Sequence, residues 1–376
     1  MNTILHISTV HGRYDTRILL KECLSLKKSG YNVFLLVVDC MEDETFEGVK
    51  IQNLNSKRNT ISRFRRMLLF PIVAFRRIII IKPSVVHFHD PELMLLGLWL
   101  RFFGFKVIYD IHDELDEQIL HKTYLPVYLR TVLSRALYFF EQFTAKFMSG
   151  IVVVNDKMQK KYWRLWEKNR VVIVENFPVF LDTYFNDSMI QDDVGFVFLG
   201  NISKARGLEK VLKLNQNLEK PLKFRVIGPV QDPEYQRALS PLLSSKGVDY
   251  LGRKENREAQ TLIRGAIAGL LIYDPLPNYI QTFPVKMFEY LINGIPLIAS
   301  NFELWKQFVD KYNCGIVVDP NDNNSIVEAL LYAFYHKEEM RTMGMNGMKA
   351  VQSFYSWSFS EKKLIAFYKN IEDEKN

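Results

Sequence analysis

The chain has 376 residues, of which 48% are hydrophobic, 24% charged and 13% aromatic. At about 100–200 residues per domain, this composition predicts about two compact domains and excludes a disordered chain or a collagen-like repeat. The three cysteines are widely spaced and form no Cys-x-x-Cys motif, which excludes a disulfide scaffold and a cysteine zinc site.

Nothing in the sequence predicts export or a membrane span. The first apolar run, residues 4–9, lacks the basic flank and the long apolar core of a signal peptide. The apolar stretch 67–75 contains Pro71 and ends at Arg76, well short of the ~20 residues that a bilayer requires. We therefore expect a cytoplasmic protein.

Positive charge is concentrated in the first half of the chain. Residues 1–190 hold 26 lysines and arginines against 20 acidic residues, and no acidic residue lies between Glu47 and Asp90. Basic and apolar residues interleave over 50–82, as in an amphipathic segment on an anionic membrane, where each cation contributes about 1 kcal/mol. A solvated helix face explains the pattern equally well. No nucleic-acid-binding motif accompanies the charge, so nucleic acid is not an expected partner.

Short apolar, β-branched runs alternate with helix-length stretches along the whole chain. Buried parallel strands have this character, and the alternation predicts an α/β fold with doubly wound parallel sheets. The polar segment 175–193 is typical of a linker, so we place one domain at 1–180 and a second at 190–356. The predicted strands are residues 4–8, 33–37, 85–88, 107–110, 151–154, 195–199, 223–228, 248–251, 269–273, 296–299 and 315–318.

Ligands of such sheets bind beyond the carboxyl ends of the strands. The chain has no GxGxxG or GxxxxGK[ST] motif and no Asp-x-Asp pair, so neither a dinucleotide site nor a carboxylate pair for a metal is predicted. A bound anion would therefore be held by helix N-termini and cationic side chains.

Residues 274–290 predict a helix that follows a strand and begins at such an anion site. We expect Thr282 or Phe283 to lie near its N-cap and Pro284 to take the first position, so that backbone N–H groups up to Lys286 face a phosphate. Glu289, one turn further, is suited to hydrogen bonding the hydroxyls of a ribose. An ordinary i,i+3 ion pair with Lys286 explains Glu289 as well.

The turn 198–208 carries a second cationic element. Arg206 follows a predicted strand and a glycine, where a guanidinium can bind two phosphate oxygens, although a solvent-exposed turn residue is the alternative.

Motifs in both halves resemble those of retaining GT-B glycosyltransferases of family four, of the bacterial polysaccharide-assembly type. The second-half motifs are PVKMFEY (284–290), NGIPLIAS (293–300) and CGIVVDP (314–320); the first-half motifs are 8–17, HFHDPE (87–92), YDIHDE (109–114) and ENFP (175–178). The resemblance implies two Rossmann-like domains facing across a cleft, the first binding the acceptor and the second the donor. It also implies that the last helix, 357–376, crosses back onto the first domain.

The resemblance further implies a reaction and its partners. A nucleotide-diphosphate sugar would be the co-substrate, and a lipid-linked or growing saccharide the acceptor, in capsule or O-antigen synthesis. The enzyme would be peripheral on the inner face of the cell membrane, in contact with anionic lipid, and would use no cofactor and no metal. A nucleotide-sugar epimerase, a sugar phosphorylase and a non-catalytic carbohydrate-binding assembly protein remain alternatives.

Individual residues acquire expected roles from the same resemblance. The family usually has two glutamates at the donor helix; Glu289 matches the second, whereas Gln281 stands at the first and cannot stabilise positive charge. His89 matches a histidine near the transferred sugar, so His89 and Gln281 are the expected catalytic residues. Asn201 and Arg206 stand where two cations are usual. The expected donor residues are Gly12, Asn201, Arg206, Gly228, Gly252, Arg253, Thr282, Phe283, Lys286 and Glu289, and the expected acceptor residues are Arg13, Asp15, Arg17, His112 and Asp113.

Overall fold

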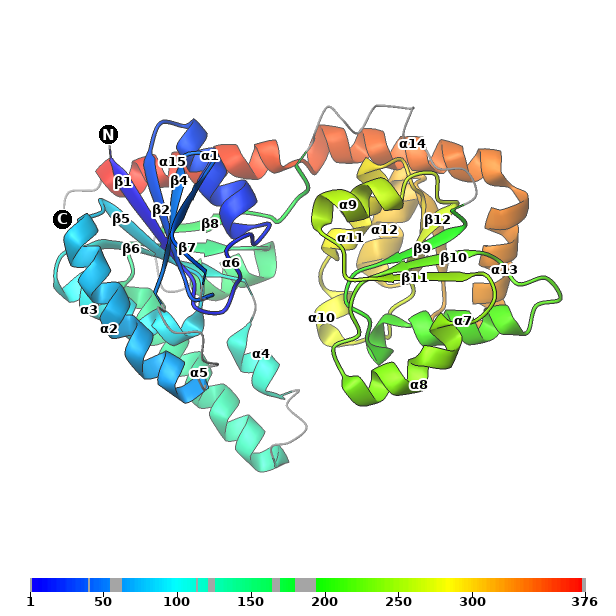
Figure 1. Ribbon diagram of the computed structural model, residues 1–376, viewed down its shortest axis with the longest axis horizontal. Helices are drawn as coiled ribbons and strands as arrows, with labels where there is room; N and C mark the ends of the chain where they lie inside the picture. The colour runs from blue at the N-terminus through cyan, green and yellow to red at the C-terminus, as the bar shows by residue number, and fades with distance from the viewer. Residues whose placement is uncertain are drawn as a thin grey trace. The chain divides into compact units, whose positions relative to one another are not determined.

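The computed structural model describes residues 2–39, 41–54, 63–112, 114–120, 126–163, 170–179 and 194–373, with side chains at 63–69, 117, 118 and 163 left out. The chain forms two compact units, shown in Figure 1. Unit 1 comprises Met1–Asn176 and Trp357–Asn376, and unit 2 comprises Phe177–Ser356. In the described part of the chain, no helix is both long and apolar enough to cross a bilayer.

Unit 1 is built on an eight-stranded sheet in the order β3-β4-β2-β1-β5-β6-β7-β8. All neighbouring strands pair in parallel except β3, which runs antiparallel to β4. The predicted parallel pairing therefore holds among the other seven strands, and the antiparallel edge strand β3 was not predicted. The strands are β1 (Thr3–Ile7), β2 (Asn32–Val37), β3 (Glu44–Phe46), β4 (Val49–Asn53), β5 (Val85–Phe88), β6 (Lys106–Ile111), β7 (Gly150–Val153) and β8 (Val171–Ile173).

Three of these strands, β3, β4 and β8, were not predicted from the sequence. Strand β3 has three residues and none is buried, while β4 alternates buried and exposed side chains at its start, so neither forms the continuous apolar run by which the central strands were recognised. Strand β8 begins an apolar run, residues 171–174, that the sequence analysis missed.

Helices cover both faces of the unit 1 sheet, and the last of them comes from the end of the chain (Figure 1). The Trp357 indole N–H donates to Ser25 Oγ at 2.9 Å. A Cβ on Gly150 would lie 2.4 Å from Phe367, so a glycine permits this close packing. The helical segments are η1 (Ile18–Cys23), α1 (Leu24–Lys28), α2 (Arg63–Ile81), η2 (Pro91–Leu93), α3 (Met94–Phe102), α4 (Leu115–Leu120), α5 (Val127–Phe147), α6 (Asp156–Trp163) and α15 (Trp357–Asp373).

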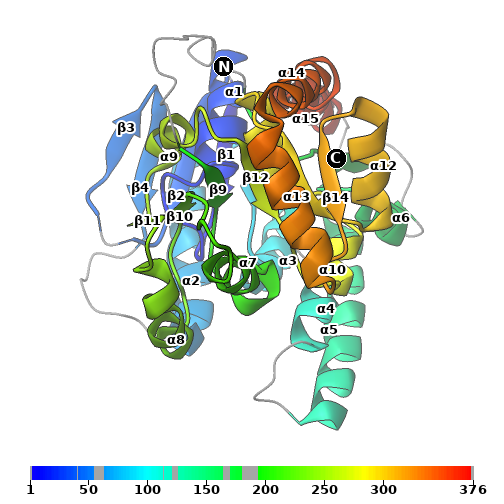
Figure 2. The same ribbon diagram turned by 90° about the vertical axis from the view of Figure 1, so that its right-hand side faces the viewer.

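Unit 2 contains a six-stranded, all-parallel sheet in the order β11-β10-β9-β12-β13-β14, and its six strands correspond to the six runs predicted for this half. The core divides into two layers, since α7, α8 and α13 pack on one face and α9, α11 and α12 on the other. Figure 2 shows α7 between α8 and α13. The strands are β9 (Phe196–Leu199), β10 (Phe224–Ile227), β11 (Val248–Gly252), β12 (Ala268–Leu271), β13 (Leu297–Ser300) and β14 (Gly315–Val318). The helices are η6 (Lys204–Arg206), α7 (Leu208–Gln216), α8 (Pro233–Leu243), α9 (Asn256–Leu262), α10 (Pro277–Ile280), α11 (Val285–Ile292), α12 (Glu303–Tyr312), α13 (Asn323–Tyr335) and α14 (Lys337–Phe354).

Candidate functional site

The carboxyl edge of the unit 2 sheet brings three glycine turns into close contact. Gly200 and Gly228 end β9 and β10 with φ of +125° and +149°. The Gly228 N–H donates to Gly252 O at 2.7 Å, and a Cβ on Gly228 would lie only 1.9 Å from Gly200 O. Glycine is therefore required here for packing, and it also leaves the backbone accessible to a ligand at this edge.

Two cations meet beside Gly200. A Cβ at this position would lie 3.2 Å from Arg206 Nη1 and 3.3 Å from Lys286 Cε. Arg206 Nη1 donates to Asn201 O at 3.0 Å, and its guanidinium lies 5.6 Å from the centre of the Tyr273 ring. The structure thus brings Lys286 beside Asn201 and Arg206, although it lies 80 residues after Arg206 in the sequence.

The helix that carries Lys286 begins one residue later than predicted. Pro284 is the N-cap, with an extended ψ of 138°, and α11 begins at Val285. Thr282 and Phe283 therefore lie just before the N-cap, but the prediction that Pro284 takes the first helical position is wrong. The Phe283 ring packs against Phe288 and Phe308, which keeps the chain extended up to Pro284. The first N–H groups of α11 have no acceptor within the helix and remain suited to an anion.

Glu289 lies inside α11 and is 8% exposed. Its Oε2 accepts from Lys286 Nζ at 2.8 Å and from Gln260 Nε2 at 3.0 Å. Gln260 Oε1 in turn accepts from Asn293 Nδ2 at 2.6 Å. The i,i+3 ion pair therefore exists, in a buried network whose other members the sequence analysis missed. No local signal points to Gln260, because α9 contributes it from 29 residues away.

The remaining predicted donor residues occupy varied positions around this edge. Gln281 is exposed directly after α10, and Arg253 is exposed directly after β11. Two hydrogen bonds hold Thr282 in place: its Oγ1 donates to Asn278 O at 2.6 Å, and its carbonyl accepts from the Trp305 indole N–H at 2.8 Å. The structure leaves Gln281 and Arg253 accessible, whereas Thr282 and Phe283 support the local fold.

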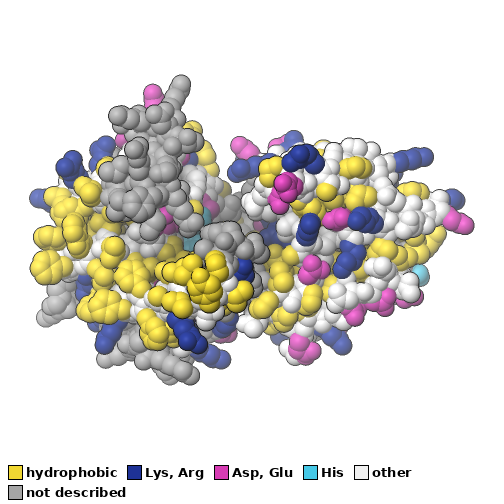
Figure 3. Space-filling view, turned by 90° about the horizontal axis from the view of Figure 1, so that it is seen from below, with side chains coloured by type: hydrophobic (Ala, Val, Ile, Leu, Met, Phe, Trp, Pro, Cys, Tyr) yellow, Lys and Arg dark blue, Asp and Glu magenta, His cyan; other side chains and the backbone are white. Residues whose placement is uncertain are grey.

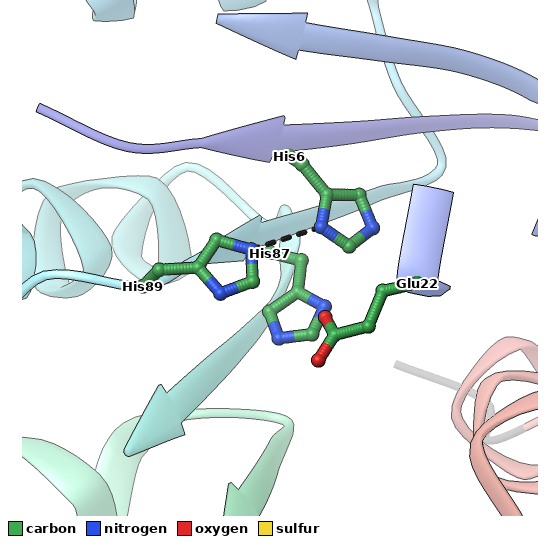
Figure 4. Close-up of side chains that lie close together, drawn as sticks. All are labelled: His6, Glu22, His87 and His89. Atoms are coloured by element: carbon green, nitrogen blue, oxygen red, sulfur yellow. Dashed lines mark hydrogen bonds between the residues drawn. The ribbon is translucent and has the colours of Figure 1, made fainter. Parts of the chain in front are cut away.

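In unit 1, His89 follows β5 and is 2% exposed. His89 Nδ1 lies 3.2 Å from Asp110 Oδ2 and 3.2 Å from His112 Nε2. On the other side of the ring, His89 Nε2 lies 2.9 Å from His6 Nδ1, the contact drawn in Figure 4. Burial lowers the pKa of His89, so the ring is neutral at physiological pH.

A chain of buried polar side chains extends behind His89. Tyr368 from α15 brings its hydroxyl within 3.1 Å of His6 Nε2 and 2.6 Å of His87 Nδ1. Burial lowers the pKa of His6 and His87 well below the usual value, so both rings are neutral. The sequence analysis missed this chain because its members lie on β1, β5 and the C-terminal helix.

Arg17 lies in an internal ion-pair network rather than at an open surface. It is 4% exposed, its Nη2 donates to Asp110 Oδ1 at 3.0 Å, and its Nη1 donates to Val174 O at 2.8 Å. Although burial favours the protonated acid, Arg17 and His112 hold the pKa of Asp110 well below its usual range. Glu22 Oε1 lies 3.0 Å from Arg17 Nε, and burial together with the nearby Asp110 raises the pKa of Glu22 well above its usual value.

Arg13 is likewise buried, at 3% exposure, where it pairs with Asp39 and with Glu44 at 2.9 Å. We predicted that Arg13 and Arg17 line a ligand-contacting loop; the structure instead uses both guanidiniums to hold unit 1 together. A carboxylate partner explains both placements, because an unpaired arginine is costly to bury.

The loop that contains Gly12 is organised by carboxylates. Asp15 accepts from the backbone N–H groups of Arg17 and Ile18 at 2.9 and 3.0 Å, and lies 3.3 Å from His11 Nδ1. A Cβ on Gly12 would meet nothing within 4 Å, so this glycine is not required for packing inside unit 1. His112 is half-buried, and Asp113 lies outside the described residues.

Two family models match the chain, one in each half. The model described as "Glycosyltransferase Family 4" matches residues 16–177, and the one described as "Glycosyl transferases group 1" matches residues 182–350. A probable sucrose-phosphate synthase of rice (Oryza sativa subsp. japonica) is 33% identical over 79 residues, which are 21% of this chain and 8% of that protein. The chain therefore matches only a small part of this relative's length.

Solved structures match over nearly the whole chain. The sucrose-phosphate synthase from Thermosynechococcus elongatus superposes with a TM-score of 0.74 at 16% identity, covering 99% of both chains. Anabaena HepE, solved in complex with UDP-glucose, superposes with a TM-score of 0.71 at 10% identity, covering 98% of this chain and 99% of that one. These likenesses confirm the predicted class of two parallel-sheet α/β domains.

Proposed function

Because the chain belongs to the group 1, family 4 glycosyltransferases of the GT-B fold, we propose that it transfers a sugar, with retention, from a nucleotide-diphosphate sugar to an acceptor hydroxyl. One observation carries the proposal, namely the meeting of Arg206 and Lys286 beside Gly200, one turn from the buried Glu289. In this proposal unit 2 binds the donor and unit 1 binds the acceptor.

The chemistry follows from the charge that the reaction creates. When the bond between the sugar and the diphosphate breaks, negative charge grows on the leaving phosphate oxygens. The guanidinium of Arg206, the ammonium of Lys286 and the first N–H groups of α11 stabilise that charge in a partly buried place, where electrostatic stabilisation is strong. Glu289 Oε1 accepts from the ribose hydroxyls, while Oε2 keeps its contacts with Lys286 and Gln260.

We further propose that His89 and the exposed Gln281 position the transferred sugar. Gln281 donates and accepts hydrogen bonds but cannot stabilise positive charge on the anomeric carbon. The departing phosphate takes the proton of the acceptor hydroxyl as the new glycosidic bond forms on the same face, so that no side-chain nucleophile is needed.

Two alanine variants, each removing one cation of η6, test the proposed donor site. We expect Arg206→Ala to weaken UDP-glucose binding by about 1.5–3 kcal/mol, roughly 10- to 150-fold, because a charge-assisted contact with the diphosphate is lost. Lys204→Ala removes an exposed cation two residues away, which lies over Tyr235, and should change affinity little. Calorimetric titration of each variant with UDP-glucose, ADP-glucose and GDP-glucose measures these affinities. Equal affinities for the two variants would refute the assignment of Arg206.

For the acceptor we propose a lipid-linked or growing saccharide, presented at an anionic membrane. Helices α2, α3 and α5 pack side by side and expose large apolar side chains, among them Ile80 at 73%, Trp99 at 62%, Phe102 at 86% and Phe139 at 68%. Figure 3 shows hydrophobic side chains gathered on this part of unit 1, with basic side chains beside them. Neither α2 nor α3 contains an acidic residue, and the one acidic residue of α5, Glu141, is buried. Exposed apolar groups among cations match the surface of an anionic bilayer.

Vesicle binding tests this surface. The full chain should co-sediment with vesicles that contain phosphatidylglycerol and much less with pure phosphatidylcholine, and Trp99→Ser with Phe102→Ser should weaken the binding. Tyr335→Ser, which changes a residue of unit 2 that is 74% exposed, is the matched control. Binding that is independent of lipid charge, or unaffected by the double variant, would count against a membrane surface.

A sugar phosphate is the second candidate acceptor, since two of the similar proteins are described as sucrose-phosphate synthases. A panel of sugar phosphates and lipid-linked saccharides, with UDP-glucose as donor, separates the two. Product formed without any acceptor would favour an epimerase, and donor binding without any transfer would favour a non-catalytic binding protein.

A further inference from the structure

Four side chains of unit 2 form a line of hydrogen bonds that ends at Glu289. Arg264 Nε donates to Asn293 Oδ1 at 3.4 Å. Asn293 Nδ2 donates to Gln260 Oε1 at 2.6 Å, and Gln260 Nε2 donates to Glu289 Oε2 at 3.0 Å. Gln260 lies in α9, Arg264 follows that helix, and Asn293 follows α11. We call Asn293 and Gln260, which lie between the guanidinium and the carboxylate, the amide pair.

The two ends of the line determine which way each amide points. A guanidinium can only donate hydrogen bonds, and a carboxylate can only accept them. If the amide of Gln260 were reversed, its oxygen would face Glu289 Oε2 and its nitrogen would face Asn293 Nδ2. Two acceptors would then meet at one end and two donors at the other. Each amide of the pair therefore has one orientation that satisfies its neighbours.

The remaining N–H groups of the amide pair also have acceptors. Gln260 Nε2 donates to Asn256 Oδ1 at 3.2 Å, one turn earlier in α9. Asn293 Nδ2 donates to the Glu289 carbonyl at 2.8 Å, one turn earlier in α11. Because Gln260 and Glu289 are only 5% and 8% exposed, water competes little for these hydrogen bonds, and a fully satisfied buried network is rigid. The amide pair is therefore fixed before any ligand binds.

The Glu289 carboxylate is held by the amide pair and by Lys286. Lys286 Nζ and Gln260 Nε2 both donate to Oε2, at 2.8 and 3.0 Å. The Lys286 side chain is 28% exposed and, in the proposed function, also binds the diphosphate. Gln260 comes from a different helix and keeps its hold on Oε2 when Lys286 turns toward a phosphate. The other oxygen, Oε1, is then the one that accepts from a ligand.

We propose that Gln260 and Asn293 are positioning residues of the nucleotide site. They fix the rotation of the Glu289 carboxylate so that Oε1 receives the hydroxyls of a ribose, and they thereby make the site select ribonucleotides over nucleotides that lack these hydroxyls. A carboxylate that is already oriented loses little entropy on binding, and without the hydroxyls it is left unpaired in a buried place. The inference rests on the proposed function, because it assumes that unit 2 binds the nucleotide.

Calorimetry of the full chain with paired nucleotides tests the proposal. Titrations with UDP, ADP and GDP identify the nucleotide that binds most tightly, and the same nucleotide in its 2′,3′-dideoxy form is the second ligand. We expect Gln260→Leu to weaken binding of the ribonucleotide by about 3- to 30-fold, a part of what loss of Glu289 itself costs, and to leave the dideoxy form unaffected. Gln307→Leu is the matched control, since Gln307 also donates to a glutamate, Glu303 at 2.6 Å, but on the exposed face of α12. The control should not change the preference for ribose.

A purely structural role of Gln260 would weaken both ligands alike, and this result, or an unchanged preference for the ribonucleotide, would overturn the proposal. If circular dichroism shows that Gln260→Leu does not fold, Asn293→Ala takes its place with the same expectation, because it removes the partner of Gln260 Oε1 at a half-buried position. No binding of any of the three nucleotides to the unmodified chain would reject the proposed donor site, and this inference with it. Nucleotide binding with the same ribose preference in Gln260→Leu would reject the amide pair alone.

Discussion

Replacing Gly228 by alanine should destabilise unit 2 far more than the same change at Gly252. Both glycines end neighbouring strands and both have positive φ, +149° and +63°. A Cβ at Gly228 would lie 1.9 Å from Gly200 O, whereas ordinary contacts begin near 3.4 Å; a Cβ at Gly252 would meet nothing within 4 Å. Gly228→Ala therefore combines overpacking, about 1–3 kcal/mol, with backbone strain, about 1–3 kcal/mol. Gly252→Ala incurs only the left-handed backbone cost of about 1–2 kcal/mol.

Urea unfolding of the two variants measures this difference, which we expect to be about 2 kcal/mol. The same clash displaces Gly200, beside which Arg206 and Lys286 meet, so UDP-glucose affinity should fall more in Gly228→Ala than in Gly252→Ala. Equal unfolding free energies for the two variants would show that the turns after β9 and β10 can move apart without loss of stability. Close glycine packing would then not determine the geometry of the carboxyl edge of the unit 2 sheet.

Three further changes probe other parts of the molecule. Glu289→Ala should weaken UDP-glucose binding by about 1.5–3 kcal/mol in calorimetry through the loss of a charged acceptor, while Glu303→Ala, at an exposed position on α12, should not. Tyr368→Phe leaves His6 Nε2 and His87 Nδ1 without their shared partner and should cost about 1–3 kcal/mol in urea unfolding, against almost nothing for the exposed Tyr335→Phe. Burial lowers the pKa of His6 and His87, so below about pH 6.5 the unfolded chain binds more protons than the folded one. The free energy of unfolding should therefore fall as the pH drops, by up to ~1.4 kcal/mol per pH unit for each of these histidines. Glu22 opposes this trend, since its raised pKa favours the folded state on acidification. Glu22→Gln, measured at pH 7.5, 6.5 and 5.5, should therefore lose stability more steeply as the pH falls. An unfolding free energy that does not change with pH would contradict neutral buried histidines.

Features encoded by consecutive residues were predictable from the sequence. The central strands are short apolar runs, and β5 and β14 coincide with their predicted ranges; β5 is buried along its whole length, and strands of that kind read as continuous hydrophobic segments. The same local logic places Arg206, Lys286 and Glu289 near the ends of strands or the start of a helix. The start of α11 was misjudged, because the packing of Phe283 against Phe308, a contact across 25 residues, keeps Pro284 extended.

The tertiary structure decided which side chains meet. Gln260 bonds to Glu289, Tyr368 bonds to two histidines, and Asp110 pairs with Arg17 in the interior; each pair is distant in the sequence. Such contacts depend on strand order and register, which residue patterns within one segment do not specify. The sequence by itself thus determined the α/β architecture and the positive charge at the carboxyl edge of the unit 2 sheet. Only the folded sheet of unit 1 decided that its conspicuous histidines and arginines meet in a buried network, since buried charges and polar groups must find partners wherever the fold brings them.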